Sequence, residues 1–245
     1  MSTAKYTSTT YNSREVRIIE ADPEAVAVEK ISGTVMNSGK YGVNGTFFNN
    51  SNDFLGIAVN RGTGIGGNAT FNAYGQKRRG TFYSYQKEIG NFRVQEVANV
   101  QKLSDYPTFP NTNYFAIGGL NLYANLSIDK TEFYRRLDVD EGAASVNDVI
   151  NKSTNGTYSD PSLRARTAIG INSAGKIVLA VFKSETPWGM REFMRSKNCY
   201  QAAYLDGGGS SQMRYKSGST SGTFDPTGVA RPVYSMVTVN PTSWT

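Results

Sequence analysis

The segment Ala202-Ala203-Tyr204-Leu205-Asp206-Gly207-Gly208-Gly209-Ser210-Ser211 joins an apolar stretch to a run of three glycines and two serines. The apolar part predicts a strand that delivers the carboxylate of Asp206 to its C-terminal end. Glycines let a ligand approach the backbone closely, and successive amides can form a concave anion site. We therefore interpret this segment as part of a binding or catalytic site. The alternative is a flexible turn between two strands.

The sequence around this segment favours a β-rich fold. Gly, Tyr and Phe are frequent, with 25, 15 and 12 residues in a chain of 245. The stretches Arg166 to Ile171 and Ile177 to Phe182 flank a Ser-Ala-Gly-Lys turn and predict a hairpin. Thr186-Pro187 predicts the start of a helix that runs to Ser196. We predict an α+β fold with a mixed, largely antiparallel sheet core and a few flanking helices, in one domain over residues 1–245.

Two further segments have a distinct pattern. Asp22-Pro23 is typical of a helix start, and Ala25, Val28, Ile31 and Val35 then keep a helical spacing until Gly39. We therefore predict a helix there. Residues 124–162 form a polar excursion with two short helical patterns, which we interpret as an insertion or lid.

The residue types restrict the chemistry. The chain has no histidine, which excludes Ser-His-Asp and Cys-His catalysis and imidazole metal ligands. The single cysteine, Cys199, cannot form an internal disulfide. We expect no cofactor; Asp206 could bind a divalent cation, but no cluster of ligands accompanies it.

Charge and hydropathy bear on partners and location. The net charge of +6 suits an anionic partner, but the basic clusters Lys77-Arg78-Arg79 and Arg135-Arg136 are too small to predict nucleic-acid binding. No apolar run approaches the length of a membrane span or of a signal peptide. We expect a soluble cytoplasmic protein; a phage-encoded protein released by lysis would have the same features.

Two more motifs contain residues suited to an anionic sugar. Arg166-Thr167-Ala168-Ile169-Gly170 places an arginine at the start of a buried strand, and guanidinium groups hold phosphate oxygens well. The alternative is an arginine paired with a structural carboxylate. Asn44-Gly45-Thr46-Phe47-Phe48 offers an amide that can donate to and accept from a sugar hydroxyl.

Taken in order, these motifs resemble the signature of the phosphodiester glycosidase domain family. The matching segments are Asn44 to Phe48, Gly118-Gly119, Arg166 to Gly170, Leu205 to Ser210 and Arg231-Pro232, within a span from Val16 to Val239. Thr46 departs from the family pattern, where a glycine is expected. The long stretch between Gly119 and Arg166 is a second departure, which would affect substrate choice.

The resemblance implies a hydrolase that cleaves the bond between C1 of a sugar and the phosphate of a sugar-1-phosphodiester. Its partner would be a phosphate-containing glycoconjugate or a nucleotide sugar. We expect Asp206 to act as a carboxylate at the sugar, with Glu185 as a second carboxylate. Phosphate would be held by Arg166, Ser210 and the amides of Gly207, Gly208 and Gly209, and Asn44 would hold sugar hydroxyls. The remaining residues expected at the site are Gly45, Gly118, Gly119, Thr167, Ser211 and Arg231.

Other function classes remain open at this stage. The same site could sequester a phosphorylated sugar or nucleotide without cleaving it, or dock on a phosphate-rich wall polymer. The Tyr-, Asn- and Gly-rich composition also permits a structural component of a phage particle.

Overall fold

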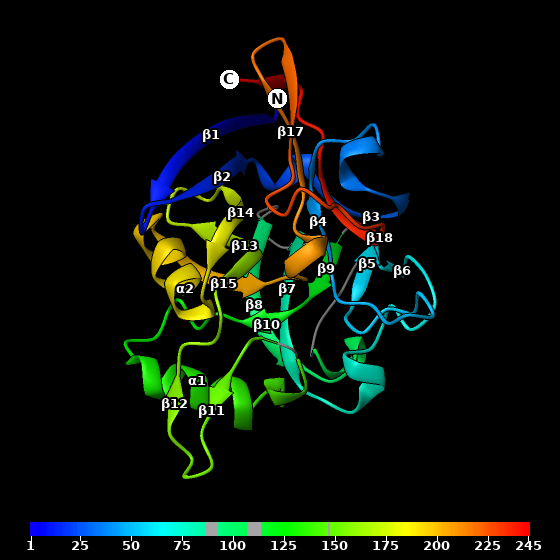
Figure 1. Ribbon diagram of the computed structural model, residues 1–245. Coiled ribbons are helices and arrows are strands. Elements are labelled where there is room, and N and C mark those ends of the chain that lie inside the picture. The colour runs from blue at the N-terminus through cyan, green and yellow to red at the C-terminus, as the bar shows by residue number, and fades with distance from the viewer. Residues whose placement is uncertain (87–92, 107–113, 147) are drawn as a thin grey trace.

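The computed structural model describes residues 1–86, 93–106, 114–146 and 148–245. Within these ranges, β-sheets make up the body of the molecule, and two α-helices lie at its side and base (Figure 1). The predicted α+β class with a largely antiparallel core is confirmed.

The largest sheet described has seven strands, and the Asp206 segment leaves one of them. In spatial order they are β10 (Leu120–Asn121), β15 (Cys199–Tyr204), β13 (Arg164–Asn172), β14 (Ile177–Glu185), β2 (Arg14–Ala21), β1 (Thr3–Tyr11) and β19 (Ser243–Trp244). The predicted hairpin is confirmed as β13 and β14, with Ala168 opposite Ala180. Only β1 and β19 pair in parallel among the strands described.

Two five-stranded sheets and a small hairpin complete the described strands. One sheet has the order β17 (Thr220–Phe224), β16 (Met213–Ser217), β4 (Gly42–Asn44), β18 (Val233–Val239) and β3 (Val26–Gly33). The other has the order β6 (Thr63–Gly64), β5 (Ala58–Asn60), β9 (Tyr114–Gly118), β7 (Arg79–Gln86) and β8 (Arg93–Val100). The hairpin pairs β11 (Asn151–Lys152) with β12 (Tyr158–Ser159).

Strand β14 shows how the layers pack, because both of its faces are buried. Its side chains alternate between faces, as in any strand. Ile177, Leu179 and Val181 join a core shared with the two smaller sheets, whereas Val178 and Phe182 face a second core that includes helical residues. The large sheet is therefore a central layer with apolar contacts on each side.

The helices are α1 (Lys130–Val139) and α2 (Pro187–Ser196), and both begin at a residue that caps the N-terminus. Thr186 accepts a hydrogen bond from the Gly189 amide and Pro187 occupies the first turn, as predicted. Helix α2 packs against the large sheet, and α1 lies below it beside β11 and β12 (Figure 1). Neither helix has the length and apolar character to cross a membrane.

The helix predicted from Ala25 to Gly39 is wrong. Pro23–Ala25 form one short 3-10 turn, and the chain then continues as β3. Val26 and Val28 point inward with a period of two, and Val28 pairs with Val237 of β18. The pairing partner lies far away in the sequence, so local spacing could not reveal it.

Residues 124–162 contain α1, a 3-10 turn at Ala143–Ser145 and the hairpin of β11 and β12. The first of the two short helices expected there is confirmed as α1, whereas the second is a single turn and no α-helix among the described residues. The Pro- and Asn-rich stretch from Tyr106 to Asn113 is typical of a loop, and its residues 107–113 lie outside the described residues.

Candidate active site

Asp206 stands just beyond the end of β15, where backbone bonds from two other segments fix it. The amide of Leu205 donates to the carbonyl of Thr167 at 2.8 Å, and the amide of Asp206 donates to the carbonyl of Gly45 at 3.1 Å. The side-chain amide of Asn44 donates to the carbonyl of Asp206 at 2.8 Å. Three motifs that are far apart in the sequence thus meet at Leu205-Asp206.

Asn44 and Thr167 hold Asp206 from inside the protein. Both are completely buried, and Oδ1 of Asn44 accepts from the Thr167 hydroxyl at 2.8 Å and from the Gln212 amide at 3.2 Å. The polar atoms of Asn44 are therefore used within the protein. Asn44 and Thr167 therefore support the Leu205-Asp206 backbone from within the protein. They do not line the cavity, where a contact with sugar hydroxyls was expected of Asn44.

The glycine run turns sharply after Asp206. Gly208–Ser210 form a 3-10 turn, in which the Ser210 amide donates to Gly207 and the Ser211 amide donates to Gly208. The Gly207 amide donates to Oδ1 of Asp206 at 2.9 Å. Because these three amides already donate within the protein, an anion cradle in this run can consist of Gly208 and Gly209 at most.

Arg231 faces Asp206 from the loop before β18. Its Nη2 lies 3.2 Å from Oδ2 of Asp206, and its Nε donates to the hydroxyl of Ser210 at 2.7 Å. The guanidinium carbon lies 4.9 Å from the centre of the Phe48 ring. Half of the arginine side chain is exposed, so it can contact both the carboxylate and a ligand.

Burial dominates the electrostatics of Asp206. The residue is 7% exposed, and this burial raises the pKa of its carboxyl above the ordinary value. Hydrogen bonds from Ser210 and Gly207 and the charge of Arg231 act in the opposite direction. A carboxyl group whose pKa is moved toward neutrality is suited to proton transfer.

Arg166 belongs to β13 and to the cavity lining, and it is 1% exposed. Its Nε donates to the carbonyl of Glu185 at 3.0 Å, and its Nη2 donates to the carbonyls of Asp148 at 2.6 Å and Ser162 at 3.3 Å. Nη1 donates to the hydroxyl of Tyr204 at 2.8 Å. All four acceptors are neutral oxygens, so the arginine contributes positive charge but has few donors left for a phosphate.

Tyr204 is a site residue that the sequence interpretation missed. Its hydroxyl accepts from Arg166, which leaves its own proton available for another acceptor. Burial raises the pKa of Tyr204, although Arg166 lowers it, and the phenol therefore stays protonated at neutral pH. A Cβ at Gly207 would lie 2.4 Å from this hydroxyl, so the glycine is needed for Tyr204 to reach the site.

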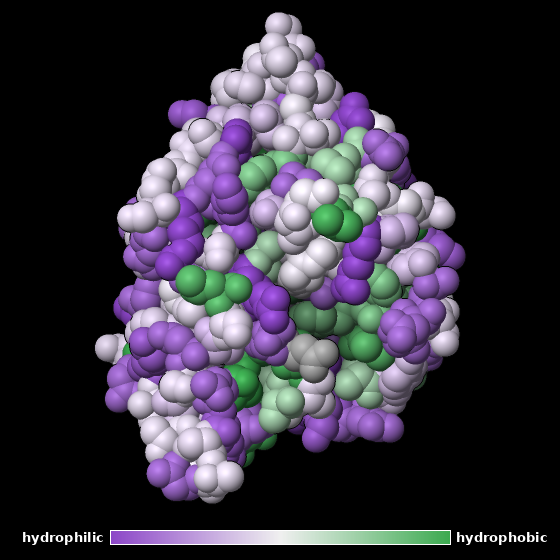
Figure 2. Space-filling view, viewed as in Figure 1, coloured by the Kyte–Doolittle hydropathy of each residue, from purple (hydrophilic) through white to green (hydrophobic). Residues whose placement is uncertain are grey.

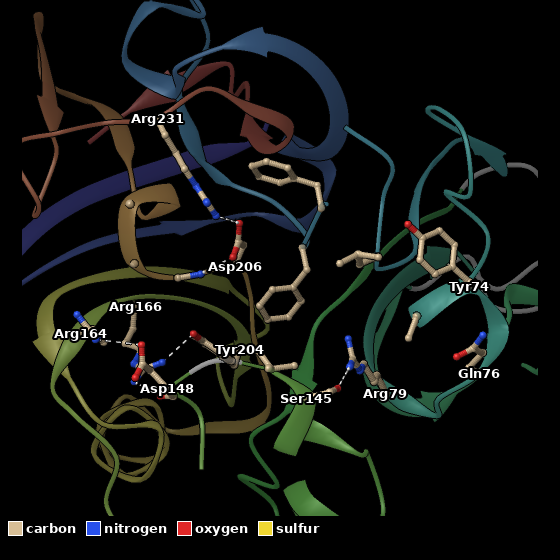
Figure 3. A pocket seen from close by; sticks show the side chains of 18 residues that line it. Tyr74, Gln76, Arg79, Ser145, Asp148, Arg164, Arg166, Tyr204, Asp206 and Arg231 are labelled. Atoms are coloured by element: carbon tan, nitrogen blue, oxygen red, sulfur yellow. Dashed lines mark hydrogen bonds and ion pairs between the residues drawn. The ribbon is translucent and has the colours of Figure 1, made fainter. Parts of the chain in front are cut away.

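A cavity of about 590 Å³ is lined by Asp206, Arg231, Arg166 and Tyr204 together with other residues. Its volume is within the size range of small-molecule sites. The hollow is visible on the molecular surface, with apolar side chains at its bottom and hydrophilic side chains at its rim (Figure 2). The lining consists of residues 47–48, 55, 73–74, 76, 79, 145–146, 148, 164, 166, 204, 206–209 and 231. A close view shows the charged and aromatic side chains around it (Figure 3).

The charges of the lining favour an anion. The cations are Arg79, Arg164, Arg166 and Arg231, and the carboxylates are Asp148 and Asp206. Arg164 pairs with Asp148 at 3.1 Å. Two positive charges are thus in excess at the cavity wall.

Other residues expected at the site lie away from the cavity. Glu185 is buried, and its carboxylate accepts from the Thr186 amide at 2.8 Å and from Asn12 at 3.1 Å, near Arg14. The structure therefore does not bring Glu185 to Asp206 as a second carboxylate. Asp148 is the other carboxylate of the lining, and no sequence motif singles it out within the excursion over residues 124–162.

The remaining glycines allow close packing of the backbone. A Cβ at Gly119 would lie 2.0 Å from the carbonyl of Tyr204, and a Cβ at Gly118 would lie 2.4 Å from Oδ1 of Asn72. At Gly45 it would lie 2.4 Å from the Ser235 hydroxyl. None of these three belongs to the lining. Ser211 is buried as well, and its hydroxyl has no partner among the described residues.

Among the described residues, no group of three or more Asp, Glu or Cys side chains is placed to hold a metal ion. The described cavity thus combines an excess of positive charge with one buried carboxylate, one adjoining arginine and a phenol that can donate a proton.

The chain belongs to the phosphodiester glycosidase family, whose model matches residues 37–240. This confirms the resemblance inferred from the ordered motifs. A search of curated protein sequences gives no match.

Solved structures show the same fold. The zebrafish N-acetylglucosamine-1-phosphodiester alpha-N-acetylglucosaminidase catalytic domain, auto-inhibited by its pro-peptide, is 15% identical, with a TM-score of 0.61. The match covers 98% of this chain and 83% of that one. A putative exported protein from Burkholderia pseudomallei is 11% identical with a TM-score of 0.61, over 93% of this chain and 74% of its own.

Proposed function

We propose that this protein hydrolyses the bond between the anomeric carbon of a sugar and a phosphate oxygen, in a sugar-1-phosphodiester or a related nucleotide sugar. The observation that carries the proposal is the buried carboxylate of Asp206 beside Arg231, at the wall of a cavity with an excess of positive charge. Family membership and the phosphodiester glycosidase named among the solved structures support the choice of bond.

The reaction consumes one water molecule. The C1–O bond breaks, and its electron pair stays on the phosphate oxygen, which leaves as a phosphate monoester. The oxygen of water bonds to C1, and its proton goes to a base. Because the phosphate is a weak base, the main requirements are to stabilise positive charge at the sugar and to hold the departing anion.

Asp206 is the group suited to the sugar side. As a carboxylate it would take the proton from water or stabilise the positive charge at C1, and Arg231 favours its ionised form. The sequence-based assignment of Asp206 to this role therefore stands as a proposal. Asp148 replaces Glu185 as the second carboxylate to consider, because it lies at the cavity wall.

Four groups are suited to the phosphate side. Tyr204 can donate its remaining proton, the amides of Gly208 and Gly209 are unused by the turn described above, and Arg231 is half exposed. Arg166 would act through Tyr204 and through its charge, because its donors are directed to neutral oxygens of the protein. This differs from the direct phosphate contact expected from the sequence.

The first test is a screen of sugar-1-phosphodiesters and nucleotide sugars with detection of the released sugar and phosphate. Asp206→Asn should lower kcat/KM by at least about a hundredfold, on the scale of a lost catalytic carboxylate or electrostatic group. Asp140→Asn is the matched control, because Asp140 is on an exposed face beside Arg135 and Arg136. A folded Asp206→Asn variant with full activity would refute the proposal.

A second test identifies the bond. In water labelled with heavy oxygen, cleavage at C1 places the label on the sugar, whereas cleavage at phosphorus places it on the phosphate. We expect the label on the sugar. Label on the phosphate would make the protein a phosphodiesterase of another kind, and binding of all the diesters without turnover would make it a binding protein.

A further inference from the structure

Arg79 is a second buried cation at the cavity, and the proposed reaction does not use it. It is the first residue of β7 and is 5% exposed. It belongs to the cavity wall and lies across from Asp206 (Figure 3). From the sequence, it was one member of a small basic cluster, Lys77-Arg78-Arg79.

The guanidinium of Arg79 has few partners within the protein. Its Nη2 donates to the hydroxyl of Ser145 at 3.3 Å, and its Nε is buried without a hydrogen-bond partner among the described residues. The oxygens of nearby Glu141 accept from the amides of Gly80 and Asn121, and no ion pair between Glu141 and Arg79 is found in the described chain. The charge of Glu141 acts on Arg79 from beyond ion-pair distance, so within the described parts of the chain the guanidinium is a buried cation without a bonded counter-charge, which is costly.

The two sides of the cavity differ in charge. Both carboxylates of the lining, Asp148 and Asp206, lie on the side away from Arg79 (Figure 3). Gln76 and Tyr74, which are neutral, are the labelled neighbours on its own side. An anion at Arg79 would therefore meet a positive charge, the Ser145 hydroxyl and an uncharged amide, with no opposing carboxylate in the described lining.

We infer that Arg79 and Ser145 form a second anion subsite, which binds a phosphate or carboxylate on the part of the substrate beyond the scissile phosphate. This inference rests on the proposed function for the identity of the reaction. It makes Arg79 a specificity-determining residue. A guanidinium with a free edge and an adjoining hydroxyl recognises the oxygens of either anion.

The test compares three sugar-1-phosphodiesters that share the sugar and differ in the alcohol beyond the phosphate: neutral, phosphorylated or carboxylated. Arg79→Met should lower kcat/KM for an anionic alcohol about ten- to a hundredfold more than for the neutral one, the usual value of a charged hydrogen bond. The larger loss identifies phosphate or carboxylate as the preferred anion.

Arg78→Met is the matched control. Arg78 is the neighbouring residue, but its side chain is exposed and donates to the carbonyl of Asn99, away from the cavity lining. We expect it to leave the ratio between anionic and neutral substrates unchanged. An equal loss for all three substrates in Arg79→Met would assign Arg79 to the shape of the wall alone and would overturn the subsite.

Phosphate binding separates this inference from the proposed reaction. Calorimetric titration of the wild-type protein with inorganic phosphate should give two sites, and Arg79→Met should retain one. If no diester is hydrolysed but this loss occurs, the subsite stands and the reaction is wrong. If diesters are hydrolysed and Arg79→Met binds phosphate as the wild type does, the subsite is wrong.

Discussion

Replacing Glu141 with Gln should remove a large part of the pH dependence of stability. Glu141 is 1% exposed and accepts hydrogen bonds from the amides of Gly80, at 2.7 Å, and Asn121, at 3.0 Å. Burial raises the pKa of this carboxyl from 4.5 to about 7, even though these bonds and the charge of Arg79 lower it.

The sign of the stability change with pH depends on when the Glu141 carboxyl loses its proton in the folded and in the unfolded chain. Below pH 4.5 the carboxyl is protonated in both states, and its contribution to stability is complete. As pH rises, the unfolded chain releases this proton first, so the folded state loses stability until pH passes about 7. At about 1.4 kcal/mol for each pH unit between the two pKa values, the loss amounts to about 3 kcal/mol.

Urea denaturation at pH 5 and pH 8 measures this loss. Between these values, the free energy of unfolding of the wild type should fall by about 2.5 kcal/mol relative to Glu141→Gln, which cannot ionise, because a small part of the loss is already complete at pH 5. Other titrating groups, including Asp206, are present in both proteins and cancel. Glu24→Gln is the control, because Glu24 is 57% exposed. Parallel curves for the wild type and Glu141→Gln would refute the reasoning.

Two further predictions concern the support of the site. Gly119→Ala should lower the free energy of unfolding by about 2–3 kcal/mol, because the added Cβ would lie 2.0 Å from a backbone carbonyl that cannot move aside easily. Gly175→Ala is the control in the same denaturation experiment. A Cβ at Gly175 would meet no atom within 4 Å, so this substitution lowers stability only through the positive φ of the residue. Asn44→Ala should cost about 3 kcal/mol, because it leaves the carbonyl of Asp206, the Thr167 hydroxyl and the Gln212 amide without their partner. An Asn44→Ala variant as stable as the wild type would show that water replaces the amide.

The sequence predicted elements whose determinants are local. Helix α2 follows from a capping threonine and a proline at its first position, and the β13–β14 hairpin follows from two apolar runs around a short turn. Strand β3 could not be recognised in this way. Its inward residues fit a helical spacing as well as a strand, and only its pairing with β18 decides between them.

The same distinction between local and non-local determinants applies to the residues of the site. Asp206 and its glycine run are evident as a motif, and Arg231 follows from the ordered pattern. Arg79 is not evident, because its position at the cavity depends on segments that are remote in sequence. Tyr204 stands two residues before Asp206, so the alternation of side chains along a strand could have indicated it. Glu185 is the second carboxylate expected from the sequence, but its side chain accepts a hydrogen bond from the Thr186 amide and does not line the cavity. The direction of a side chain is set by packing, which local pattern does not contain.

The bonds of Arg166 have a consequence for how this scaffold can vary. The arginine holds residues 148 and 162 through their carbonyl oxygens, and carbonyl oxygens are present whatever the side chain. At these two points the excursion that forms one wall of the cavity is fastened by its backbone and not by its residue types. Side chains of the excursion that only line the cavity can therefore be exchanged while the Arg166 anchor and the Asp206 loop stay in place. Directed evolution for new substrates should accordingly tolerate substitutions at Ser145 and Val146 far better than at Arg166.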